Sequence, residues 1–201
     1  GLLMELHNYI FDSKYKKSVA YFSMEFAIHQ ALKIYSGGLG FLAGSHMRSA
    51  YELKQNIIGV GILWSYGYYD QTRNEDRSLK ADFIRKNYSY LKDLGILASV
   101  TICNKEVLVK AYYLAPTIFN CAPLILLSTD IEENDYLSRT ITQKLYDVNE
   151  EARIAQEIIL GIGGVKVLEA LNKKIDIYHM NEGHALPLVY ELYNKYESLK
   201  I

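Results

Sequence analysis

Four consecutive residues in the first quarter of the chain, Gly37-Gly38-Leu39-Gly40, could bind an anion through backbone groups alone. Three of them lack a side chain, so a ligand can approach the backbone closely. Apolar spacing predicts a helix over residues 41–53, and the N-terminus of a helix favours an anion such as phosphate. The spacing matches neither the dinucleotide fingerprint nor a P-loop. A tight turn that needs positive φ angles explains the glycines equally well, so both interpretations stay open.

A second turn whose side chains could bind a ligand or take part in a reaction is Asn181-Glu182-Gly183-His184. An amide, a carboxylate and an imidazole together offer donors, acceptors and a titratable ring to a polyol. The alternative is structural, because Asn or Glu can cap a following helix and His184 can be a satisfied core residue. His179 lies at an alternating position within the preceding strand. For that histidine we expect a structural role.

Both turns come directly after predicted strands. Residues 18–24 and 174–180 are short, β-prone runs, and residues 56–64 form a third. Helices are predicted over residues 41–53 and 185–199. The first quarter therefore predicts a β-loop-α-β unit of a parallel sheet. In such sheets ligands lie beyond the carboxyl ends of the strands, where both turns are expected.

The remaining segments complete an α/β pattern. Residues 96–103 and 106–114 are β-prone and two residues apart, which indicates a tight hairpin inserted in the parallel sheet. A buried strand is predicted over residues 123–128 and a helix over residues 149–171. Three glycines inside this helix predict a kink or close packing; they are Gly161, Gly163 and Gly164. Apolar spacing at residues 1–15 predicts an amphipathic helix.

Composition excludes several classes of protein. The 201 residues are 50% hydrophobic and carry a formal net charge of −1, which disfavours nucleic acid and anionic membrane surfaces as partners. No apolar stretch is long enough to span a bilayer. Cys103 and Cys121 are too few for a metal quartet or a disulfide framework, so we expect reduced thiols, no metal site and a cytoplasmic protein.

Three motifs, taken together and in order, resemble the α-glucan phosphorylases of glycogen, starch and maltodextrin, particularly the shorter bacterial and archaeal type. They are AYFSMEF at residues 20–26, IYSGGLGFLAG at residues 34–44 and YHMNEGHA at residues 178–185. Further matches include Thr129-Asp130-Ile131 and the run from Arg153 to Glu157. The resemblance extends from about residue 19 to the end.

This resemblance implies a two-domain glycosyltransferase of the B type, in which two Rossmann-like domains face each other across a cleft. Residues 1–201 would be the first, glucan-side domain. In such enzymes inorganic phosphate cleaves the terminal α-1,4-linked glucose with retention and releases glucose 1-phosphate. Pyridoxal phosphate assists, and its attachment lysine lies in a C-terminal domain that this sequence lacks. The resemblance also implies a homodimer for the complete enzyme and inactivity for this chain alone.

The resemblance also assigns roles to individual residues. Gly37, Gly38 and Leu39 would hold the glucosyl and phosphate groups, and Asn181 would contact the substrate. The catalytic or sugar-contacting residues of the family match Glu25, Glu182 and His184. Residues expected only to shape the cleft are Arg153, Gln156 and Glu157.

Some positions depart from the family pattern. Ser45 stands where an acid is usual, Ser65 where a basic residue is frequent, and Asp70 where a basic residue is common. These changes favour, as an alternative, a glucan-binding protein without turnover. A glycogen or starch synthase is a weaker alternative, since its glycine loop usually follows a lysine, whereas Tyr35-Ser36 precedes this one. An exposed apolar face is expected where a second domain would dock.

Overall fold

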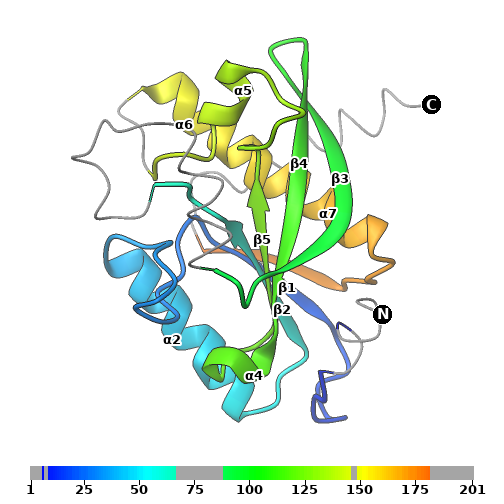
Figure 1. The fold of residues 1–201 in the computed structure, drawn as a ribbon. Helices are drawn as coiled ribbons and strands as arrows, with labels where there is room; N and C mark the ends of the chain where they lie inside the picture. Colours follow the sequence, from blue (N-terminus) through cyan, green and yellow to red (C-terminus); the bar gives the residue numbers. More distant parts are fainter. Residues whose placement is uncertain (1–5, 7–8, 67–87, 146–148, 182–201) are drawn as a thin grey trace.

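The computed structural model describes residue 6 and residues 9–66, 88–145 and 149–181 (Figure 1). The secondary structure begins with β1 (Val19–Phe22), α2 (Gly38–Glu52), β2 (Ile57–Ile62), β3 (Lys92–Ile102), β4 (Lys105–Leu114) and α4 (Pro116–Phe119). It continues with β5 (Leu124–Ser128), α5 (Tyr136–Thr140), α6 (Glu150–Ile158), the π-helical segment η2 (Ile159–Gly163), α7 (Gly164–Ala170) and β6 (Ile177–Met180).

The strands form one six-stranded sheet in the order β3-β4-β5-β2-β1-β6. The pairs β1/β2, β1/β6 and β2/β5 are parallel, whereas β3/β4 and β4/β5 are antiparallel. Every residue of β2 and β5 is buried, as expected for central strands covered on both faces. The predicted hairpin therefore extends the main sheet at one edge, and the predicted α/β class with a largely parallel sheet is confirmed.

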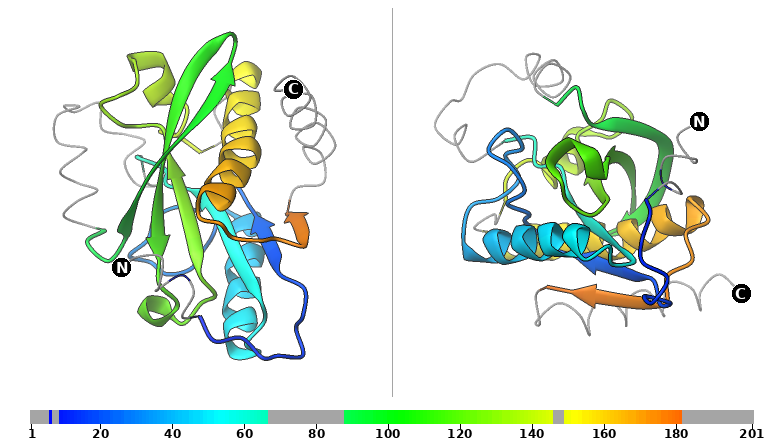
Figure 2. Two further views of the ribbon diagram at one scale, coloured as in Figure 1. Left: turned by 90° about the vertical axis from the view of Figure 1, so that its right-hand side faces the viewer. Right: turned by 90° about the horizontal axis from the view of Figure 1, so that it is seen from below.

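Helices cover both faces of the sheet (Figure 2). A Cβ built on Gly59 of β2 would lie 2.7 Å from Met47 of α2, so this face of β2 packs against α2. A Cβ on Gly164, at the start of α7, would lie 2.8 Å from the side chain of Val60. Because neighbouring strand residues point to opposite faces, α2 and α7 lie on opposite sides.

Helix predictions were partly correct. The helix predicted over residues 149–171 is continuous but contains the π-helical segment η2, in which Gly161 and Gly163 lie. A Cβ at Gly164 would lie 2.6 Å from the ring of Phe22, which confirms the predicted close packing. The helix predicted over residues 1–15 is wrong for residues 9–15, because Asp12 accepts a hydrogen bond from the Lys14 backbone and forms a turn instead. The helix predicted over residues 185–199 lies outside the described residues.

Candidate active site

The carboxyl ends of β1 and β6 lie side by side. From β1 the chain passes through α2 to β2 on one side, whereas β6 pairs in parallel with the other side of β1. Open α/β sheets bind ligands outside the carboxyl ends of their strands. The glycine loop and Asn181 both follow these two strands.

The glycine loop is the first turn of α2. The helix begins at Gly38, three residues earlier than the sequence predicts, and has no side-chain cap and no acidic residue in its first turn. Gly37 is extended, with φ −157° and ψ −160°, and the one described glycine with a positive φ is Gly95. The interpretation as a turn that needs positive φ is therefore wrong.

The loop glycines differ in what surrounds them. A Cβ at Gly37 or Gly38 would meet no atom of the described residues within 4 Å. A Cβ at Gly40 would lie 2.8 Å from the Tyr35 Cβ and 2.9 Å from the Glu25 Oε1, so packing requires a glycine there. Neither packing nor backbone conformation requires Gly37 and Gly38, and the space above them is open to a ligand.

Glu25 holds this loop in place. Its side chain is 2% exposed, and its Oε1 accepts hydrogen bonds from the backbone N–H groups of Ser36 at 2.7 Å and Gly37 at 3.1 Å. The Ser23 hydroxyl donates to the Glu25 carbonyl at 2.8 Å and fixes the turn after β1. The carboxylate predicted to be catalytic thus faces the loop backbone; its catalytic role stays a prediction.

Asn181 joins β6 to the same place. Its backbone N–H donates to the Phe22 carbonyl at 2.8 Å. Its side-chain Nδ2 lies 3.4 Å from the Ser23 hydroxyl and 3.5 Å from the Leu39 carbonyl. The predicted substrate-binding residues therefore converge at the ends of β1 and β6, while Glu182 and His184 lie outside the described residues.

An aromatic cluster lies beside these strand ends. The ring of Tyr21 on β1 contacts the rings of both His46 and His179, with centroid distances of 4.7 Å and 5.1 Å. His179 stacks on Tyr21, in agreement with the structural role predicted for it. Burial, and to a lesser extent the charge of His179, lowers the pKa of His46 below its ordinary value.

The residues predicted to shape the cleft all lie on α6. Gln156 is 1% exposed, and its Nε2 donates to the Lys144 carbonyl at 2.8 Å, while its Oε1 has no hydrogen-bond partner among the described residues. Arg153 is exposed and Glu157 is half-buried. Gln156 thus supports the segment after α5, and a cleft-shaping role for the three stays a prediction.

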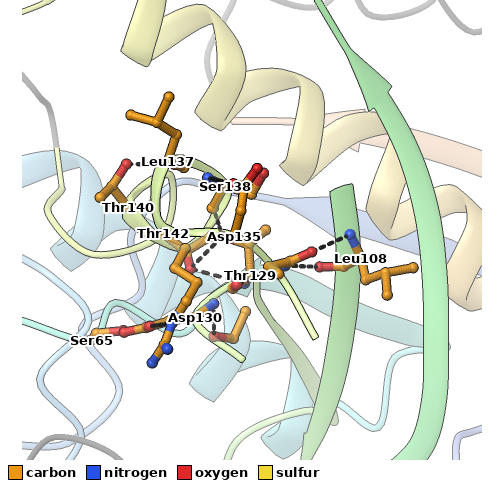
Figure 3. Close-up of polar contacts among 12 residues, drawn as sticks. Ser65, Leu108, Thr129, Asp130, Asp135, Leu137, Ser138, Thr140 and Thr142 are labelled. Carbon is orange, nitrogen blue, oxygen red and sulfur yellow. Dashed lines mark hydrogen bonds and ion pairs between the residues drawn. The ribbon is translucent and has the colours of Figure 1, made fainter. Parts of the chain in front are cut away.

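A polar cluster beyond β2 and β5 was missed by the sequence analysis (Figure 3). Asp130 accepts hydrogen bonds from the Ser65 hydroxyl at 2.7 Å and from Arg139 Nε at 2.9 Å. Thr129 and Thr142 pair through their hydroxyl groups at 3.2 Å. The motif Thr129-Asp130-Ile131 is the sequence signal for this cluster, whereas Ser65 is predicted only as a departure from the family pattern.

Buried polar groups concentrate on this edge of the sheet. The buried polar residues in the described part of the chain are Ser18, Ser23, Glu25, Ser65, Ser128, Thr129, Ser138, Thr142 and Gln156. All except Ser18 end a strand at its carboxyl end, follow one, or bond to such a loop. Buried polar groups cost free energy unless they are satisfied, so their concentration here indicates a functional edge.

Other kinds of site receive no support from the described residues. They contain no cluster of three metal-ligating side chains, and both cysteines are free thiols. In the same described part, no helix is both long enough and apolar enough to span a membrane.

Comparison with solved structures indicates the fold class of the chain. The structure is similar to the catalytic domain of starch synthase IV from Arabidopsis thaliana bound to ADP and acarbose, with a TM-score of 0.58, 15% identity, and coverage of 88% of this chain and 31% of that chain. At this identity the likeness shows the fold alone, which is that of part of a B-type glycosyltransferase. No family model matches the chain.

The sequence comparisons are more specific. The chain is 38% identical over 186 residues to glycogen phosphorylase of Mycobacterium tuberculosis, covering 83% of this chain and 21% of that protein. It is 35% identical over 179 residues to maltodextrin phosphorylase of Thermococcus litoralis, covering 85% and 21%. An uncharacterized protein, MJ1631 of Methanocaldococcus jannaschii, is 54% identical over 180 residues, covering 90% of this chain and 34% of the relative.

The predicted resemblance is therefore confirmed: the chain is homologous to a segment of proteins named glycogen or maltodextrin phosphorylase. It spans only about a fifth to a third of the length of these relatives.

Proposed function

We propose that this chain is the glucan-side part of an α-glucan phosphorylase, which transfers a terminal glucosyl unit of an α-1,4-glucan to inorganic phosphate and releases glucose 1-phosphate. The observation that carries the proposal is the open start of α2. Gly37 and Gly38 leave free space above backbone N–H groups that have no partner within the helix. Homology to segments of named phosphorylases supports the assignment of this space to a sugar and a phosphate.

The chemistry that this chain would supply is electrostatic and positional. The N–H groups of Gly38 and Leu39 would donate to phosphate or sugar oxygens, at the end of the helix that favours negative charge. Glu25 would fix the loop through its hydrogen bonds to Ser36 and Gly37, so the donors need not reorganise when charge develops. Asn181, with Glu182 and His184 immediately after it in the sequence, would contact sugar hydroxyl groups.

Pyridoxal phosphate does not fit the described residues of this chain. Among the described lysines, Lys173 has a pKa lowered by burial, as a Schiff-base lysine often has. However, Lys173 precedes the amino end of β6, at the opposite edge of the sheet from the glycine loop. We therefore propose that the cofactor is held by a second domain outside this sequence. We also propose that the complete enzyme is a dimer.

The apolar surface beside the loop is consistent with such a second domain. Phe41 and Leu42, in the first turns of α2, are 58% and 61% exposed. Side chains of a helix lean towards its N-terminus, so these two lie on the side of the open glycines. Their exposure supports the expectation of an apolar face at the edge of the cleft.

The test is phosphorolysis of maltoheptaose in phosphate buffer with pyridoxal phosphate, measured as released glucose 1-phosphate, with calorimetric titration of the same oligosaccharide. We expect binding of maltoheptaose and no release by the 201-residue chain. Release would contradict the requirement for a second domain, and absence of any binding would contradict the proposed glucan side. Transfer from ADP-glucose would instead support the synthase alternative.

A glucan-binding protein without turnover remains the second candidate. The contact of Ser65 with Asp130 favours it, because this position carries a neutral hydroxyl in place of the basic residue that the resemblance leads one to expect. Phosphorolysis by this chain together with the proposed second domain separates the two candidates: binding without turnover supports the second.

A further inference from the structure

Asp130 lies at the centre of the polar cluster that the proposed function leaves unassigned (Figure 3). Its side chain is 7% exposed, although it is charged and follows a buried strand. One carboxylate oxygen accepts from Ser65 at 2.7 Å and the other accepts from Arg139 Nε at 2.9 Å. Both oxygens are therefore used: the bond from Ser65 fixes the carboxylate, and the carboxylate fixes the Nε side of Arg139.

The guanidinium of Arg139 has capacity left. It carries five N–H donors, and Asp130 uses the one on Nε. Within the described ranges, the two terminal nitrogens have no hydrogen-bond partner, and the side chain is 36% exposed. A guanidinium held at Nε presents its remaining donors as a rigid, planar fork.

The backbone that carries Arg139 is also fixed. The Thr129 hydroxyl donates to the Ser138 carbonyl at 2.7 Å, and Asp135 accepts from the Ser138 N–H at 2.9 Å (Figure 3). The Arg139 N–H donates to the Asp135 carbonyl at 3.0 Å. A solvent-exposed ion pair needs no such support, because it contributes little to stability. A supported arginine is typical of a binding residue.

The position of Arg139 relates it to the glycine loop. Asp130 follows β5, and in the sheet only β2 separates β5 from β1, whose carboxyl end leads to the loop. The polar cluster that holds Arg139 and the segment that leads to the glycine loop therefore both follow strands at their carboxyl ends. Open α/β sheets bind their ligands at this edge.

We propose that Arg139 is a further glucan-binding residue, which donates hydrogen bonds from its terminal nitrogens to hydroxyl groups of a sugar unit outside the glycine-loop subsite. Asp130 balances its charge, which favours neutral hydroxyl groups over a free anion. Asp130 and Ser65 are then positioning residues. This inference rests on the proposed function.

The test is calorimetric titration of maltoheptaose and of glucose 1-phosphate into the wild type, Arg139→Gln, Arg139→Lys and Lys14→Gln. Lys14 pairs with Asp12 at 3.9 Å before the amino end of β1, and it provides an ion pair at the opposite end of the strands from the site. We expect Arg139→Gln to weaken maltoheptaose binding roughly tenfold, as loss of hydrogen bonds from a charged donor implies, and to leave glucose 1-phosphate binding unchanged. Arg139→Lys should give an intermediate loss, and Lys14→Gln none.

The outcomes distinguish this inference from the proposed function. If the wild type binds maltoheptaose and both Arg139 variants bind it equally well, the inference is overturned while the proposed function stands. An equal loss for both ligands, or a loss in Lys14→Gln as well, would also overturn it, because the effect would then be one of folding. If the wild type binds neither ligand, the proposed function fails and the inference fails with it. Arg139→Lys, which preserves the charge beside Asp130, gives a folded test even where Arg139→Gln unfolds.

Discussion

Substitution of Gly38 by alanine should separate stability from binding. A Cβ at this position meets no atom within 4 Å, and its φ is not positive, so the folded structure accommodates it without strain. Alanine is favoured over glycine in a helix by up to about 1 kcal/mol, and less at the first helical position. Because each kcal/mol shifts the Tm of a chain of this size by about 2–4 °C, we expect a Tm unchanged or raised by up to about 4 °C.

The affinity of Gly38→Ala for a ligand should fall, although its stability does not. The added methyl group occupies the space through which a ligand reaches the N–H groups at the start of α2. Loss of one hydrogen bond to a charged group costs about 1.5–3 kcal/mol, which corresponds to roughly a ten- to hundredfold weaker Kd for glucose 1-phosphate. The assay is calorimetric titration of that ligand, combined with thermal unfolding followed by circular dichroism.

Gly163→Ala is the matched control for this experiment. It lies in η2, where an added Cβ would meet Val109 and Val100 at ordinary contact distances of 3.6–3.7 Å. It should leave the Kd unchanged. The reasoning is refuted if Gly38→Ala binds glucose 1-phosphate as well as the wild type, since the open space would then serve no ligand. A fall in Tm of more than a few degrees would instead contradict the absence of steric contacts.

Three further substitutions or measurements test other parts of the structure. Gly44→Ala should lower the free energy of unfolding by about 3 kcal/mol or more in guanidinium denaturation, because the added Cβ would lie 2.1 Å from the Ala27 carbonyl oxygen. A change below about 0.5 kcal/mol would contradict the close packing of Gly44 against Ala27. Burial raises the pKa of the Cys121 thiol to about 12. Iodoacetamide at pH 8 should therefore modify the exposed Cys103 and spare Cys121 in the native state, as measured by mass spectrometry. Equal rates of modification at the two cysteines would contradict the burial of Cys121. Burial and a neighbouring imidazole lower the pKa of His46 in the folded state. As the pH falls below about 6.5, the unfolded state therefore takes up a proton before the folded state does, and the free energy of unfolding decreases until the pH reaches the folded-state pKa. His46→Asn should remove this pH dependence of the free energy of unfolding, as measured by urea titrations.

Local patterns were sufficient to predict most of the elements. The buried run at residues 123–128 and the β-prone run at residues 174–180 predict β5 and β6, which the structure shortens to Leu124–Ser128 and Ile177–Met180. The hairpin prediction placed the turn at Asn104-Lys105, whereas Cys103 and Asn104 adopt it with φ of 50° and 62°. Because the strand order depends on contacts distant in sequence, the pairing of β4 with β5 and of β1 with β6 could not be read from local patterns.

The candidate site was predictable only where the signal was local. The glycine loop stands out because side chains are missing from successive positions, and Asn181 stands out because it ends a strand. By contrast, the contact between Ser65 and Asp130 joins residues 65 positions apart, and the hydrogen bonds that Glu25 accepts from Ser36 and Gly37 depend on how the chain folds back. No local pattern identifies such partners, so the cluster around Asp130 emerged only from the three-dimensional structure.

The way α2 is anchored explains how its start can remain open. A side-chain cap would stabilise the helix by about 1 kcal/mol, yet α2 has none, and Gly37 occupies the cap position. The helix is held instead along its length: the Gly40 carbonyl accepts from the Ala27 N–H at 2.8 Å, and Arg48 donates to the Ala27 carbonyl at 2.8 Å. Since these contacts fix the helix without using its first N–H groups, those groups remain available to a ligand. A helix that needed its own cap for stability could not offer them.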